Sequence, residues 1–144
     1  MITGFNHTSF TVSNLERSMD FYISMYGLEL ISLADRPMEY VEKVTKVKSR
    51  MRVAYLRGAG ITLELIEYLG SMKREMKSSV DNIGCGHICF NVDDLNKVIY
   101  VLQQKGVRFL GELVTVPVGA NKGSLIIYAL DPDGIVTELI QPSK

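Results

Sequence analysis

The sequence contains one arrangement of segments twice, and this repeat restricts the possible folds more than any other feature. Residues 60–66 (GITLELI) and 134–140 (GIVTELI) match at an offset of 74, with five of seven residues identical. Residues 5–12 also resemble residues 86–92, and His7 then aligns with His87 at an offset of 80. The repeat indicates two copies of one supersecondary unit, which bury their apolar faces together because neither can do so alone.

Each copy is predicted to have the element order β-α-β-β-β. Residues 4–12 and 84–92 are rich in Phe, Val, Thr and Ile, which favours strands. Apolar residues then recur at helical spacing, after the expected N-caps Asn14 and Asp93 and before a terminating glycine. The remaining strands are expected at residues 28–33, 51–56 and 61–67 in the first copy and at 107–110, 124–130 and 135–140 in the second.

Two stretches interrupt the symmetry of the copies. Residues 37–48 are predicted to form an extra short helix or lid in the first copy, and the polar, Lys- and Ser-rich residues 69–82 to form a linker. The expected organisation is a first module at 1–68 and a second at 83–144, which together make one compact domain of the α+β class. A chain of 144 residues is long enough to bury a substantial core.

The two histidines of the chain and two of its glutamates occupy equivalent positions in the copies. Glu64 and Glu138 each stand in the middle of an apolar strand, where a charge is costly unless it is paired or bound to a metal. His7 and His87 lie on the strand faces that point away from the helices. Either residue type alone in a strand is usually structural or solvated, but the repeat couples all four. We therefore expect these two imidazoles and two carboxylates to bind one divalent cation.

Two cysteines flank one of these histidines. Cys85 and Cys89 are predicted to share a strand face with His87, and their spacing of four residues along a strand, roughly 13 Å, is beyond the limit for a disulfide. A zinc site with sulfur ligands is one alternative. The first copy has Phe5 and Ser9 at the equivalent positions, which favours an interpretation in which the cysteines line a cavity.

Charge and hydropathy exclude several classes of partner. The 16 basic and 16 acidic residues balance and form no basic stripe, so we expect no nucleic-acid binding. The longest apolar runs are too short to cross a bilayer, and the N-terminus does not resemble a secretory signal, so we expect no membrane association. Two unpaired cysteines fit a reducing, cytoplasmic location.

Taken together, these residues resemble the vicinal oxygen chelate superfamily, which includes lactoylglutathione lyase (glyoxalase), methylmalonyl-CoA epimerase, extradiol dioxygenases and bleomycin or fosfomycin resistance proteins. The likeness covers nearly the whole chain. It rests on His7, residues 12–22 and 26–28, residues 63–65, residues 86–88 and 92–95, and residues 131–134 and 138–139. It implies two tandem βαβββ modules that form a cupped mixed sheet around a metal bound by His7, Glu64, His87 and Glu138.

The resemblance is greatest to the lyase and epimerase branch, because that branch uses four protein ligands. It implies a glyoxalase-like lyase or isomerase whose small-molecule substrate presents vicinal oxygens to one divalent ion (Ni, Zn, Co, Mn or Fe). A proton next to a carbonyl would move through a metal-stabilised enediolate, with Glu64 or Glu138 as the catalytic base. Two glutamates, rather than a glutamine and a glutamate, favour glyoxalase.

Other members of the superfamily supply the alternatives: an epimerase like that for methylmalonyl-CoA, an extradiol-type dioxygenase, or an antibiotic-binding resistance protein without catalysis. Ser32 and Tyr68 replace an Arg and an Asn of bacterial glyoxalases, and Lys48 replaces an acidic base of the epimerases. The resemblance therefore does not select between glutathione and CoA as the carrier. We expect a homodimer, in which the modules pair either within one chain or across a swapped dimer.

Overall fold

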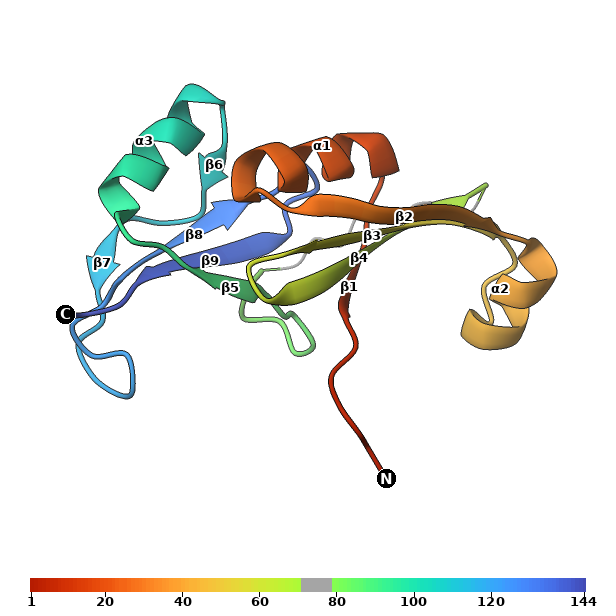
Figure 1. The fold of residues 1–144 in the computed structure, drawn as a ribbon, viewed down its shortest axis with the longest axis horizontal. Coiled ribbons are helices and arrows are strands. Elements are labelled where there is room, and N and C mark those ends of the chain that lie inside the picture. Colours follow the sequence, from red (N-terminus) through yellow and green to blue (C-terminus); the bar gives the residue numbers. More distant parts are fainter. Residues whose placement is uncertain (71–78) are drawn as a thin grey trace. The chain divides into compact units, whose positions relative to one another are not determined.

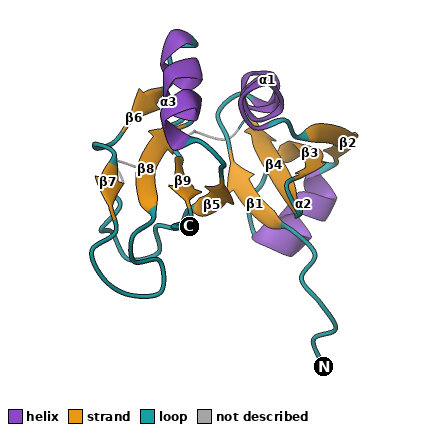
Figure 2. Ribbon diagram, turned by 60° about the vertical axis from the view of Figure 1, so that its left-hand side comes forward, coloured by secondary structure: helices purple, strands orange, loops and turns teal. Residues whose placement is uncertain are grey.

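The computed structural model describes residues 1–70 and 79–144, and it confirms the α+β class with two mixed sheets and three helices in these residues (Figure 1, Figure 2). The chain divides into two compact units, Met1–Glu75 and Met76–Lys144. Most of the predicted linker, residues 71–78, lies outside the described residues. No helix in the described part of the chain is long and apolar enough to cross a membrane.

The first unit contains a four-stranded sheet in the order β1-β4-β3-β2. β1 runs parallel to β4, and the other neighbours are antiparallel. Helix α1 lies along this sheet, and the extra helix predicted for residues 37–48 is present as α2 at its far end (Figure 1). The elements are β1 (Thr8–Thr11), α1 (Leu15–Tyr26), β2 (Glu29–Arg36), α2 (Met38–Thr45), β3 (Arg50–Gly58) and β4 (Ile61–Leu69).

The second unit repeats this plan with the strand order β5-β9-β8-β6, and a short strand β7 also pairs with β8. β5 runs parallel to β9, as β1 does to β4. The sequence did not predict β7, which forms a hairpin with β8 around residues 119–123. The elements are β5 (Ile88–Asn91), α3 (Leu95–Gln104), β6 (Arg108–Phe109), β7 (Val114–Thr115), β8 (Leu125–Leu130) and β9 (Val136–Gln141).

Helices α1 and α3 begin in the same way in the two units. The Asn14 side chain accepts a hydrogen bond from the Arg17 amide at 2.8 Å, which satisfies one of the unpaired donors of the first turn. In α3 the N-cap is Asp94, which accepts from the Lys97 amide, so the prediction of Asp93 was wrong by one residue. The backbone of Asp94 is still extended, with φ of −142°, and the helix begins at Leu95.

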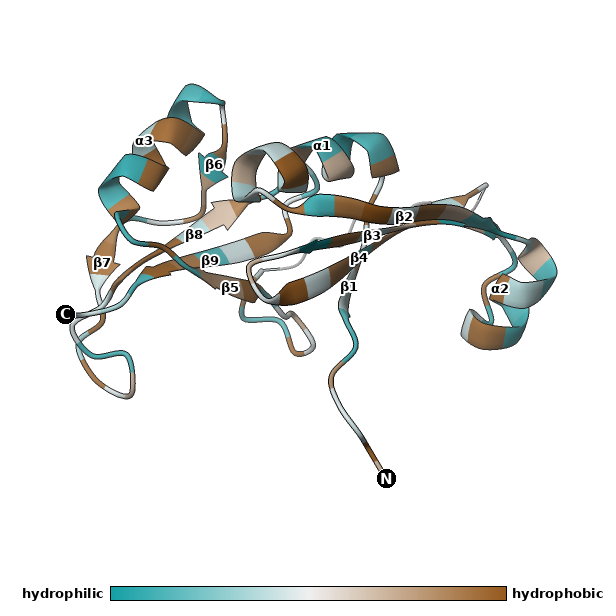
Figure 3. Ribbon diagram, in the orientation of Figure 1, coloured by the Kyte–Doolittle hydropathy of each residue, from teal (hydrophilic) through white to brown (hydrophobic). Residues whose placement is uncertain are grey.

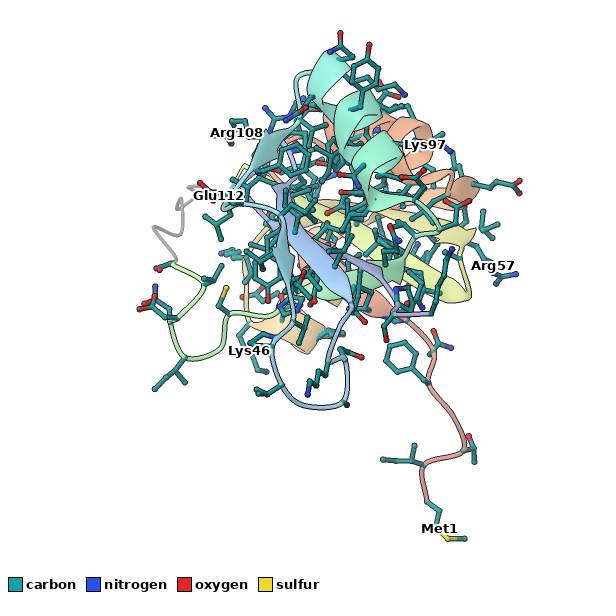
Figure 4. The ribbon with its side chains drawn as sticks, turned by 90° about the vertical axis from the view of Figure 1, so that its left-hand side faces the viewer. Met1, Lys46, Arg57, Lys97, Arg108 and Glu112 are labelled. Carbon is teal, nitrogen blue, oxygen red and sulfur yellow. The ribbon has the colours of Figure 1, made fainter. Side chains whose placement is uncertain are left out.

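The first strand of each unit is shorter than predicted. Backbone pairing begins at Thr8 with Leu63 and at Ile88 with Thr137, so His7 and His87 each lie one residue before a strand. Residues 1–7 extend away from the sheet of the first unit, and Figure 4 shows Met1 at the far end of this segment. The aromatic ring of Phe5 favours a strand in the sequence, but its side chain is 80% exposed because it packs against no sheet.

The two faces of the first sheet carry different side chains, and the hydropathy of successive residues changes along β3 and β4 (Figure 3). On β4, Leu63 and Leu65 are completely buried and point to the α1 face, while Ile66 and Tyr68 point to the opposite face. There they pack with Val41 of α2. Glu64 shares this opposite face with Ile66, so α2 covers part of the face on which the candidate site lies.

Candidate functional site

His7 and Glu64 form a close pair in the first unit. The Nε2 atom of His7 lies 3.3 Å from Oε2 of Glu64, and the glutamate side chain is only 12% exposed. Pairing of β1 with β4 sets Ser9 beside Glu64, which places the residue two positions earlier, His7, within reach of the carboxylate. We call this pair half-site 1.

His87 and Glu138 form the equivalent pair in the second unit. The Nε2 atom of His87 lies 2.9 Å from Oε2 of Glu138, and this glutamate side chain is 15% exposed. Here the strand register sets Cys89 beside Glu138. We call this pair half-site 2. Each unit thus brings two of the four predicted ligands together, whereas no three His, Cys, Asp or Glu side chains within residues 1–70 and 79–144 form a group that could hold a metal ion.

The hydrogen bonding of His7 bears on what half-site 1 can bind. Its Nδ1 atom lies 2.7 Å from the side-chain oxygen of Asn6, which can only accept a hydrogen bond, so Nδ1 carries a proton. A neutral imidazole with this tautomer has its lone pair on Nε2, facing a carboxylate oxygen of Glu64. Two such lone pairs at 3.3 Å repel each other unless a proton or a cation lies between them. The donor set of half-site 1 therefore suits a cation.

A tyrosine stands next to each glutamate on the neighbouring antiparallel strand. Tyr55 is opposite Glu64, and Tyr128 is opposite Glu138. The Tyr55 hydroxyl donates a hydrogen bond of 2.5 Å to Oε1 of Glu64. This bond, with burial and the charge of the carboxylate, raises the pKa of Tyr55 to about 12.

The tyrosine of the second unit makes no such bond. Among the hydrogen bonds of the described residues, none joins Tyr128 to Glu138, although burial and the nearby carboxylate still raise the pKa of Tyr128. Each tyrosine ring also lies near the histidine of its half-site, with ring centroids 5.5 Å apart for Tyr55 and His7 and 5.2 Å apart for Tyr128 and His87.

Cys89 borders half-site 2, and both cysteines are free. Burial, the negative charge of Glu138 and a hydrogen bond to that carboxylate raise the pKa of the Cys89 thiol to about 11. Cys89 is therefore a protonated thiol at neutral pH in this structure.

Reasoning from the sequence missed the roles of Tyr55 and Asn6. The repeat contains a signal for the tyrosines, because each one is placed opposite its glutamate by the β3–β4 or β8–β9 hairpin. Arg52 pairs with Glu16 at 2.5 Å, on the α1 face of the sheet, and Arg50 pairs with Asp35 at 3.3 Å.

Comparisons with known proteins agree with this architecture. The sequence profile of the Glyoxalase/Bleomycin resistance protein/Dioxygenase superfamily matches residues 4–139. A lactoylglutathione lyase from Schizosaccharomyces pombe is 30% identical over 96% of this chain and 47% of its own length. This chain thus spans about half the length of that relative. A 2-epi-5-epi-valiolone epimerase from Actinomyces sp. is 29% identical over 94% of this chain and 77% of its own length.

The fold has a counterpart of the same size among solved structures. A glyoxalase family protein from Bacillus cereus superimposes with a TM-score of 0.84, covering 100% of this chain and 97% of that one. The two sequences are 20% identical, so this likeness establishes the fold alone.

Proposed function

Because this chain belongs to the glyoxalase/bleomycin resistance protein/dioxygenase superfamily, we propose that it is a metal-dependent, glyoxalase-like lyase or isomerase. Its substrate is a small molecule with vicinal oxygens, and the reaction moves a proton next to a carbonyl. The observation that carries the proposal is the duplicated pair of a histidine nitrogen and a carboxylate oxygen, at 3.3 Å in half-site 1 and 2.9 Å in half-site 2.

We propose that His7, Glu64, His87 and Glu138 together hold one divalent cation, which is Ni, Zn, Co, Mn or Fe. Imidazole and carboxylate are ligands that such borderline cations accept. The tautomer of His7 supports this, since its free lone pair faces the Glu64 carboxylate. When bound, the cation supplies Lewis-acid stabilisation of the negative charge that forms on oxygen when the neighbouring carbon loses its proton.

The residues of the chain supply the base. Glu64 and Glu138 are the two carboxylates of the proposed site, and each is largely shielded from water. A carboxylate next to the reacting carbon can take its proton and return it to the adjacent carbon, because general bases act at hydrogen-bond distance. We propose that one of these two glutamates acts in this way.

A sugar-type or acyl-thioester epimerase is the second candidate. The relative from Actinomyces sp. is named as an epimerase, and an epimerase also needs a base next to an acidic carbon. We favour the lyase because the proposed ligands are two histidines and two glutamates, and it is the pair of glutamates that favours a glyoxalase-like enzyme.

The test uses the full chain, stripped of metal and reloaded in turn with Ni²⁺, Co²⁺, Mn²⁺ and Zn²⁺. Turnover is measured with hemithioacetals of methylglyoxal and with 2-substituted acyl thioesters, and NMR in D₂O follows exchange of the proton next to the carbonyl. We expect metal-dependent exchange, and we expect Glu64→Gln or Glu138→Gln to reduce it by about 100-fold or more, as for loss of a general base.

Glu67→Gln is the matched control. Glu67 lies on the same strand as Glu64 but points to the α1 face, where it accepts a hydrogen bond from the Leu15 amide at 3.3 Å. This variant should keep wild-type turnover. A protein that binds neither these four metals nor Fe²⁺, or one that keeps full turnover after both Glu64→Gln and Glu138→Gln, would refute the proposed function.

We also propose that the protein is a homodimer. The support is on β2, an edge strand of the first sheet that exposes the apolar side chains of Leu30, Ile31 and Leu33. Edge strands with exposed apolar residues tend to associate. Light scattering should give about twice the 16.1 kDa mass of the chain, and Leu33→Glu should shift the protein towards monomer. A wild-type protein that stays monomeric at high concentration would contradict this.

A further inference from the structure

We propose that Tyr55 is a positioning residue that fixes Glu64 as a rigid ligand, so that half-site 1 is preorganised and half-site 2 is the adaptable half of the metal site. This inference rests on the proposed function, because it concerns the same cation. It adds a residue that the ligand set does not include, and it distinguishes two half-sites that the repeat makes alike.

The two carboxylate oxygens of Glu64 have different partners. Oε1 accepts the bond from the Tyr55 hydroxyl at 2.5 Å, and Oε2 faces His7 at 3.3 Å. A carboxylate held by one oxygen can present the other in one orientation only. A group that hydrogen-bonds to a metal ligand in this way reduces the conformational entropy that the ligand loses when the metal binds. Removal of such a group typically weakens metal affinity ten- to hundredfold.

The orientation of His7 is also fixed, by a hydrogen bond on the ring nitrogen that does not face Glu64. Its Nδ1–H donates to Asn6 at 2.7 Å, which sets both the orientation of the ring and the nitrogen that faces Glu64. Both ligands of half-site 1 therefore have a fixed orientation before any cation arrives.

The packing of Tyr55 explains why its hydroxyl can perform this task. Its ring packs against the cluster formed by Val41 of α2 with Met51 and Val53 of β3. Helix α2 has no counterpart among the described elements of the second unit, where α3 is followed by β6 and β7. The inserted helix thus supports the tyrosine of half-site 1 alone.

Half-site 2 has the same side chains without the same support. Tyr128 stands opposite Glu138 as Tyr55 does opposite Glu64, yet no hydrogen bond joins these two described residues. Apart from His87 of the same half-site, whose Nε2 lies 2.9 Å from Oε2, the neighbour that bonds to Glu138 is the thiol of Cys89, a weak donor. Glu138 is therefore free to change its orientation at a smaller cost than Glu64.

The experiment compares Tyr55→Phe with Tyr128→Phe, which remove the same atom from equivalent positions. Affinity for Co²⁺ is measured in the full-length, metal-stripped protein by competition with a chelator at pH 7, and the visible absorption of bound Co²⁺ reports its coordination. We expect Tyr55→Phe to weaken binding ten- to hundredfold and to alter the Co²⁺ spectrum. Tyr128→Phe should stay within about threefold of the wild type.

Two further measurements separate positioning from general damage. The far-ultraviolet circular dichroism of the metal-free variants should match the wild type, since general damage to the fold would change it, although loss of the hydrogen bond to Glu64 lowers the melting temperature of Tyr55→Phe. Asn6→Ala should also weaken Co²⁺ binding. The inference is overturned if Tyr55→Phe binds Co²⁺ as well as the wild type does, or if both phenylalanine variants lose affinity equally. In either case the proposed function would still stand, provided that the wild type binds Co²⁺. A wild type that binds no metal would contradict both the proposed function and the positioning role of Tyr55.

Discussion

Cys89 is expected to react slowly because burial and a neighbouring carboxylate raise the pKa of its thiol. Its pKa is about 11 rather than 9, owing to burial and to Glu138, so the reactive thiolate at pH 8 is about 100-fold scarcer than for an ordinary cysteine. In metal-free protein, iodoacetamide should label Cys89 about 100-fold more slowly than a cysteine in an unfolded peptide, as followed by mass spectrometry. Glu138→Gln should accelerate labelling, and an unchanged rate would mean that burial alone protects the thiol.

Tyr55 should make the stability of the fold depend on pH in the alkaline range. The hydrogen bond to Glu64 raises the pKa of Tyr55 to about 12, above its ordinary value of roughly 10 in an unfolded chain. The native state therefore favours the protonated phenol. This stabilisation is complete below about pH 10 and is lost as the pH rises towards 12. Urea unfolding at pH 9 and pH 11.5 should show a smaller loss of stability for Tyr55→Phe than for the wild type. Equal losses would contradict the assignment.

At the scale of single residues, the sequence could identify charged ligands but not their supports. Glu64 and Glu138 are conspicuous because a carboxylate is costly in an apolar strand. Tyr55 is not, because an aromatic residue in a strand is ordinary, and its role depends on strand register and on a hydroxyl position. The tautomer of His7 likewise depends on the Asn6 side chain, whose orientation the sequence does not specify.

Glu67 and Gln141 connect the last strand of each unit to the start of its first helix. Glu67 accepts a hydrogen bond from the Leu15 amide at 3.3 Å, and Gln141 accepts from the Leu95 amide at 2.8 Å. The amide oxygen of Gln141 accepts this hydrogen bond in the second unit, so a glutamine can make the same bond at position 67. The free energy of unfolding of Glu67→Gln should therefore be close to that of the wild type. Glu67→Ala should cost about 1–3 kcal/mol, since it leaves a buried donor unpaired. Chemical denaturation measures both, and equal costs would contradict this role.

The elements that were predicted well are those with strong local signals. Helix α1 begins after Asn14 and ends before Gly27, whose φ of 67° suits glycine. Strand β7 has only two residues, and it forms because β8 offers pairing partners from elsewhere in the chain. The strands at residues 4–12 and 84–92 were predicted too long, because composition shows where a strand is favoured but not where its partner begins to pair.

At the scale of the whole molecule, the repeat made the fold class predictable, since two βαβββ copies require two similar sheets. Helix α2 could be predicted as an insertion, but its effect on one half-site could not. That effect arises because the ring of Tyr55 packs against the cluster of Val41, Met51 and Val53 on the site face, and the helical periodicity of residues 37–48 does not predict which side chains α2 will pack against.

The proposed sharing of one cation by both halves predicts the metal stoichiometry. The wild type should bind one Co²⁺ per chain in a calorimetric titration. The double variants His7→Ala/Glu64→Ala and His87→Ala/Glu138→Ala should each lose micromolar binding completely, because two ligands cannot replace four. Metal at 100 times its Kd should stabilise the wild type by about 2.7 kcal/mol and neither variant. Two ions per wild-type chain, with one retained in each variant, would instead indicate two independent sites, because each half-site would then bind without the other.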